Sequence, residues 1–236
     1  MPSSESLPLA MADLAAIVWF LVVWLAYGQV MDRSRLRERS LSYAMDAQRL
    51  EWMRMMGRRD LRMVDTSIMA GLQNGTAFFA STSLLAIGAA FALLTSADRM
   101  LMIFAHLTPD APMTRRDWEM KGLGLLLVYA YAFFKFGWSY RLFNYVSILV
   151  GAVPPVGEVD TPAGRAAVER AGEMLVIAGH HFNRGLRAFF FSIGFLGWFA
   201  GPWTFIAATT VIAIVLARRQ FVSDSYATVR DAGRDG

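Results

Sequence analysis

The sequence predicts an all-α membrane protein with four transmembrane helices and amphipathic helical segments on the cytoplasmic side. The main observation is a set of four long apolar stretches: Leu14–Val30, Ile68–Leu94, Gly122–Val150 and Ala188–Leu216. Because a helix rises 1.5 Å per residue, about 20 apolar residues cross a bilayer. The composition agrees, with 56% hydrophobic and 18% charged residues, against about 25% charged in soluble domains. Residues 1–236 are expected to form a single helical membrane domain.

The first stretch, Leu14–Val30, is expected to stay in the membrane as a span. A cleavable signal peptide begins with basic residues, but Met1–Asp13 contains Glu5 and no Lys or Arg. The arginines follow the stretch instead of preceding it. Since cytoplasmic connections carry an excess of Lys and Arg, the chain should begin outside the cell.

The connection that follows, Met31–Ser67, contains nine arginines and is the strongest orientation signal. Its apolar residues recur every three or four positions from Leu50 to Ile68, which is the spacing of one helical face. Two interpretations fit this pattern equally. Either a basic amphipathic helix lies in the membrane interface, or the second span extends into the cytoplasm and packs on its neighbours.

A further cytoplasmic helix is predicted before the fourth stretch. Asp160 or Thr161, followed by Pro162, makes a helix start with an N-cap and a proline in the first turn. An apolar stripe then leads toward the last span, with a bend expected at Gly185. This connection also carries four arginines: Arg165, Arg170, Arg184 and Arg187.

The first and third connections lie on the same side of the membrane, and both are rich in arginine. Since cytoplasmic connections carry an excess of Lys and Arg, both are expected in the cytoplasm. With four spans, both termini would then lie outside. Arg218 and Arg219, directly after the last stretch, oppose this assignment. The arginines of the first connection outweigh them in this count.

Two pairs of glycines have the spacing that lets helices pack closely. Gly71 and Gly75 open the second stretch, and Gly197 and Gly201 lie in the fourth. Packing within one chain is the more common reason for this spacing. Packing between subunits is the alternative.

Lys135 is the most informative polar residue, because it lies about midway along the third stretch. An unpaired charge there costs several kcal/mol. One interpretation is a cavity or anion path lined by Lys135 and Arg141. The other is that Lys135 reaches the interface or pairs with a carboxylate such as Asp65 or Asp13, and this packing role is favoured.

Other polar side chains accompany Lys135 in the spans. Ser139 lies one turn from Lys135, on the same helical face, and Asn144 follows nearer the cytoplasm. Gln73 and Asn74 lie near the cytoplasmic end of the second span. Such groups either line a water path or hydrogen-bond neighbouring helices.

The sequence contains no pattern that predicts catalysis or a bound cofactor. The chain has no Cys, so it has neither disulfides nor thiolate sites. His180 and His181 are adjacent, so on a helix they point about 100° apart and are poorly placed for one metal ion. Phosphate-loop, nucleophile and zinc patterns are absent. The arginines gather at a membrane edge, which favours anionic lipids over nucleic acid as partners.

Three segments carry a family resemblance: Asp65–Thr76, Lys135–Asn144 and Phe182–Phe191. They resemble the membrane proteins of the domain-of-unknown-function family 599, over roughly Asp13 to Phe221. The resemblance implies a multi-pass helical membrane protein of bacteria and plants, with no established reaction or ligand. It also draws attention to a cytoplasmic motif, Asn183, Arg184 and Arg187. The chain departs from the family pattern at Asp65 and Thr66, where the family often has a cation and an amide.

We therefore expect a non-enzymatic integral membrane protein that assembles through its spans, as a homo-oligomer or as an accessory subunit of a larger complex. The alternative is an oligomeric ion channel or small-solute transporter with a polar path near Lys135 and Arg141. We expect the protein in the bacterial cytoplasmic (inner) membrane, with both termini periplasmic and anionic lipids as partners.

Overall fold

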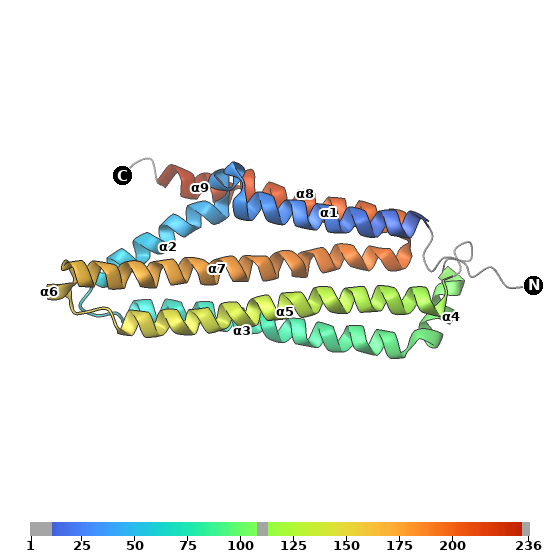
Figure 1. The fold of residues 1–236 in the computed structure, drawn as a ribbon, viewed down its shortest axis with the longest axis horizontal. Coiled ribbons are helices and arrows are strands. Elements are labelled where there is room, and N and C mark those ends of the chain that lie inside the picture. The colour runs from blue at the N-terminus through green and yellow to red at the C-terminus, as the bar shows by residue number, and fades with distance from the viewer. Residues whose placement is uncertain (1–10, 108–112, 233–236) are drawn as a thin grey trace, which may run out of the picture.

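A computed structural model describes residues 11–107 and 113–232, which form helices and turns without any strand (Figure 1). The predicted all-α fold class is confirmed. Four segments are long and apolar enough to cross a membrane: Met11–Arg33, Met63–Thr95, Arg115–Gly151 and Pro202–Val229. The elements in chain order are α1 Met11–Arg33, η1 Arg35–Arg39, α2 Leu41–Gly57, α3 Met63–Thr95, α4 Ala97–Leu107, α5 Arg115–Gly151, α6 Val156–Val159, α7 Pro162–Leu196, η2 Gly197–Ala200, α8 Pro202–Phe221 and α9 Asp224–Ala232.

The bundle has two halves along its long axis (Figure 1). The long helices α3, α5 and α7 run through both halves, with α5 packed between α3 and α7. The shorter α1 and α8 pack together beside one half of α7, and α2 packs beside its other half. The half that contains α1 and α8 is called the membrane half below.

Aromatic side chains fill the core of the membrane half. Phe20 from α1 makes edge-on contacts with Phe191 and Phe195 of α7, with ring centroids 6.0 and 5.3 Å apart. Phe205 from α8 stacks on Trp198 at 5.4 Å. Offset and edge-on pairs of this kind add to the gain from burying apolar area. They hold α1, α7 and α8 together where lipid supplies no hydrophobic drive.

The predicted fourth span, Ala188–Leu216, is wrong as one continuous helix. α7 ends at Leu196, and α8 begins at Pro202 after a tight turn. Gly201 has a φ of 130°, which a residue with a side chain rarely adopts. Pro202 then starts α8, since proline fits the first turn of a helix. The apolar stretch therefore folds as a hairpin.

The hairpin changes the direction of the chain's end. Asp13 at the start of α1 accepts a hydrogen bond from the Trp198 indole at the hairpin turn. Ser42 at the start of α2 donates to Gln220 at the end of α8. The start of α1 and the end of α8 therefore lie at opposite ends of the membrane half, as Figure 1 shows. This arrangement differs from the prediction of both termini on one side.

The predicted apolar face from Leu50 to Ile68 is divided between two helices. α2 ends at Gly57 and α3 begins at Met63. Met53 on α2 is buried in a core with α5 and α7, whereas Leu61 between the helices is exposed. α2 is thus a separate helix that packs on its neighbours, and a short non-helical connection joins it to α3.

α7 begins as predicted, because Thr161 accepts a hydrogen bond from the Gly164 amide and Pro162 is the first helical residue. The expected bend at Gly185 does not interrupt the helix. A Cβ at Gly185 would lie 2.7 Å from the ring of Phe136. The glycine therefore allows α5 and α7 to approach closely.

Candidate functional site

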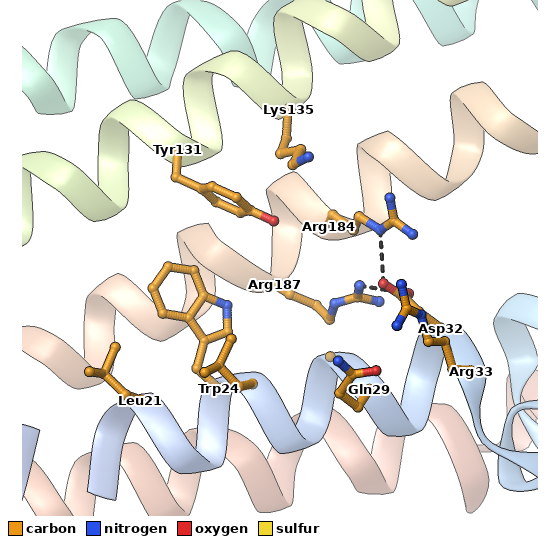
Figure 2. A pocket seen from close by; sticks show the side chains of 11 residues that line it. Leu21, Trp24, Gln29, Asp32, Arg33, Tyr131, Lys135, Arg184 and Arg187 are labelled. Carbon is orange, nitrogen blue, oxygen red and sulfur yellow. Dashed lines mark hydrogen bonds and ion pairs between the residues drawn. The ribbon is translucent and has the colours of Figure 1, made fainter. Parts of the chain in front are cut away.

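A cavity of about 410 Å³ opens between α1, α5 and α7, at the end of the membrane half that meets α2 (Figure 2). We call it the cationic cavity, because four positively charged side chains line it: Arg33, Lys135, Arg184 and Arg187. Its other lining residues include Trp24, Gln29, Asp32 and Tyr131.

Lys135 and Tyr131 come from one face of α5, one helical turn apart. The Lys135 ammonium nitrogen lies 5.2 Å from the centroid of the Tyr131 ring. Figure 2 shows both side chains pointing from α5 toward the arginines of α7. A cation over an aromatic face is attracted by the ring quadrupole. This contact holds the ammonium group at the cavity without neutralising it.

The predicted pairing of Lys135 with Asp13 or Asp65 is wrong. Asp13 bonds to the Trp198 indole at 2.6 Å and lies 3.9 Å from the ammonium of Lys121. Asp65 accepts hydrogen bonds from Trp52 at 2.7 Å and from Arg59 at 2.6 Å. Both carboxylates are engaged by other elements, and among the described residues Lys135 makes no ion pair.

Arg184 and Arg187 lie three residues apart on α7, so they share a helical face. Both reach Asp32 near the end of α1, at 2.8 and 2.9 Å (Figure 2). The two arginines and the carboxylate are half-buried. The ion pairs fix α1 against α7 and direct two guanidinium groups to the cavity wall.

The cavity has an excess of positive charge. Four cationic groups face a single carboxylate among its lining residues, which leaves a net charge of three. Partial burial weakens solvent screening of this charge. Arg and Lys clusters of this kind bind phosphate and carboxylate groups through charge-assisted hydrogen bonds.

His181 adds no charge to this region at neutral pH. Its Nδ1 atom is buried and has no hydrogen-bond partner in the structure. Burial, together with nearby Lys135 and Arg184, lowers the pKa of His181 to about 4. Neighbouring His180 instead lies 2.7 Å from Asp46, which also pairs with Arg37 and Arg49.

The other predicted polar residues lie away from the cavity. Gln73 bonds to Asn144 at 2.8 Å and to Ser147 at 3.1 Å, which joins α3 to α5. Ser139 donates to the Ala178 carbonyl at 2.8 Å and so joins α5 to α7. These hydrogen bonds are contacts between helices.

Arg141 is exposed and bonds to Tyr145 on its own helix at 2.7 Å. It does not line the cationic cavity, and Asn74 is exposed on α3. Asn183 lies beside the cavity and donates to Ser42 at 3.4 Å. The structure therefore brings Lys135 together with Arg184 and separates it from Arg141.

The glycine pairs have different surroundings. A Cβ at Gly197 would lie 3.0 Å from the Thr204 carbonyl of α8, so this glycine serves the hairpin within the chain. Gly201 forms the turn itself. Around Gly71 and Gly75, no atom from another helix in the described part of the chain lies within 4 Å of an added Cβ. That pair leaves an open face on α3.

Asp32, Gln29 and Trp24 belong to the site but are not identified by the sequence analysis. Asp32 is an acidic residue between an apolar span and a run of arginines, which is a signal for an ion pair at the membrane edge. Trp24 has no such signal, because tryptophan is common in membrane spans. Among residues 11–107 and 113–232, no group of three or more His, Asp or Glu side chains could hold a metal ion.

Residues 15–225 match the family described as "Protein of unknown function, DUF599". The chain belongs to that family. The resemblance seen in three short segments is thereby confirmed over most of the sequence. No curated protein and no solved structure matches the chain.

Proposed function

We propose that this member of the family is a non-enzymatic integral membrane protein that binds an anionic group at the cytoplasmic surface of the membrane. The observation that carries the proposal is the cationic cavity, where three charges are left unbalanced. Lys135 supports it most directly, since its ammonium group has a ring contact and no ion pair among the described residues.

The depth of the cavity in the bilayer follows from polar residues at two levels along α1. Asp13 marks one level, and Asp32 with its two arginines marks the other. These levels are 19 residues apart on α1, or about 28 Å along a helix. Since the hydrocarbon core is about 30 Å thick, the cavity lies at one of its boundaries. Lys135 would therefore sit at the interface, where its charge costs less than at the bilayer centre.

The arginine-rich region from η1 to α2 adjoins this boundary, which favours the cytoplasmic side. The chain would cross the membrane five times, through α1, α3, α5, the second part of α7 and α8. The N-terminus would be outside and the C-terminus in the cytoplasm. Arg218 and Arg219 near the end of α8 would then also be cytoplasmic. Because outer-membrane proteins are β-barrels, the membrane in a bacterial cell would be the inner one.

Self-association through α3 is a second proposal, supported by the open face at Gly71 and Gly75, which flank Gln73 on the cytoplasmic side of Lys135. Small residues on an exposed helix face allow another helix to approach closely. A conducting path through Lys135 and Arg141 has less support, because Arg141 lies outside the cavity.

Inorganic phosphate tests the anion site in the detergent-solubilised protein. A ligand that binds only the folded state raises the melting temperature as its concentration increases. We expect phosphate to raise it in the wild type and in Arg141→Gln, but far less in Lys135→Gln. Arg141→Gln is a matched control, since it removes a cation from the same helix outside the cavity. Equal responses in all three proteins, or no response in the wild type, would contradict the proposal.

A further inference from the structure

The cationic cavity continues into an apolar groove. This second hollow, of about 460 Å³, lies between α1 and α5, and its floor is formed by Phe195 of α7 and Trp198 of η2. Leu21 and Trp24 line both the cavity and the groove. The groove walls are otherwise apolar, including Phe20, Leu123 and Leu127.

The groove is deep because α5 and α7 touch beneath it. A Cβ at Gly124 would lie 2.6 Å from the ring of Phe195. The groove is also open to the surroundings, since Leu123 is 52% exposed and Leu127 is 60% exposed. In a bilayer, these two side chains would face lipid.

The distance from the cationic cavity to the middle of the groove suits one leaflet. Lys135 and Leu123 are 12 residues apart on α5, or about 18 Å along the helix. Half of the hydrocarbon core is about 15 Å thick. A chain that began at Lys135 and followed the groove would end near the middle of the bilayer.

A positive site at the interface and an apolar groove toward the bilayer centre match the two parts of an anionic phospholipid. From this juxtaposition, we propose that the protein holds an anionic phospholipid of the inner leaflet. Its phosphate contacts Lys135, Arg184 and Arg187, and one acyl chain lies along the groove past Trp24 toward Leu123. This inference rests on the proposed anion site and adds the source of the phosphate.

The experiment compares three probes on the detergent-solubilised full chain: dioctanoyl phosphatidylglycerol, glycerol 3-phosphate and dioctanoyl phosphatidylcholine. Binding is measured by native mass spectrometry and by titration calorimetry. We expect the anionic lipid to bind at least about tenfold more tightly than either of the other two, which corresponds to about 1.4 kcal/mol. Its acyl chains and its charge would both contribute.

Leu127→Trp tests the groove, because the larger side chain fills it while the cavity is left intact. Leu85→Trp is the matched control, since Leu85 is 75% exposed on α3 and lines neither hollow. We expect Leu127→Trp to weaken binding of the anionic lipid about tenfold and to leave glycerol 3-phosphate binding unchanged. Leu85→Trp should change neither.

Each other outcome is decisive. If glycerol 3-phosphate binds as tightly as the lipid, and Leu127→Trp has no effect, the site takes a free phosphate and the lipid inference fails while the anion site stands. If phosphatidylcholine binds as tightly as phosphatidylglycerol, the charge has no role, and both proposals fail. Absence of binding by all three probes also overturns both.

Discussion

The Lys135 ammonium lies above the ring of Tyr131, 5.2 Å from its centroid. The two residues are one turn apart on the same face of α5. The ammonium group thus has an aromatic neighbour where the sequence suggested a buried carboxylate. A cation held in this way can be removed without stranding an opposite charge. Its role can therefore be separated from folding.

Lys135→Met should lower the free energy of unfolding by less than about 1 kcal/mol, the usual size of an exposed cation–π contact. Asp32→Asn should cost about 1–3 kcal/mol, because it weakens hydrogen bonds to two half-buried guanidinium groups. Thermal denaturation of both variants in the same detergent measures the difference. A larger loss in Lys135→Met than in Asp32→Asn would indicate a carboxylate partner for the lysine.

The two ends of the chain should report opposite sides of the membrane. A reporter at the N-terminus should read as outside, whereas one at the C-terminus and one inserted near Gly57 should both read as cytoplasmic. The reason is that α8 returns along the bundle from the hairpin turn to the α2 end. Reporters that place both termini on the same side would show that the second part of α7 does not cross.

Gly201→Ala should destabilise the protein by about 1–3 kcal/mol, the usual cost of a backbone conformation that only glycine adopts easily. Gly137→Ala is the control. Gly137 lies within α5 with open space around it, so the alanine should stabilise by about 0.5–1 kcal/mol. Melting temperatures of the two variants should shift in opposite directions, and an unchanged Gly201→Ala protein would contradict the hairpin.

Replacing both Gly71 and Gly75 with Leu should dissociate any oligomer that forms through α3, and the fold should survive because both sites have open space. Gly197→Leu should instead destabilise the monomer, since its side chain would meet the Thr204 carbonyl. Light scattering of the detergent-solubilised variants measures the mass, and circular dichroism follows the fold. A wild-type monomer, or an oligomer that persists in the double variant, would exclude this face.

Hydropathy predicts the long apolar helices because length and composition alone identify a segment that can cross a bilayer. It fails for α7, which is not among the four apolar segments, because its apolar part, Ala188–Leu196, is short and directly follows Arg184 and Arg187. The Gly201-Pro202 pair is a recognisable turn signal. It lies inside an otherwise continuous apolar stretch, where Gly201 also has the spacing of a packing motif with Gly197.

The site was only partly predictable, because it depends on which helices lie side by side. Lys135 could be singled out because a charge inside a span is unusual. Its neighbours Arg184 and Arg187 could be found only as part of a motif, since the sequence does not state which helices meet. The pairing of α7 with α1 through Asp32 depends on the hairpin, and the predicted single span hides that contact.

The α7–α8 hairpin also bears on how the chain is inserted during synthesis. A translocon meets Ala188–Leu216 as one apolar stretch that is long enough to be released into lipid as a single helix. That arrangement would carry Arg218 and Arg219 to the outer side, whereas the hairpin in the proposed topology would leave them in the cytoplasm. In the proposed topology, the two arginines would act as a retention signal that favours the hairpin over a single long helix. Neutralising them would produce a mixed population of C-terminal tails on the two faces of the membrane.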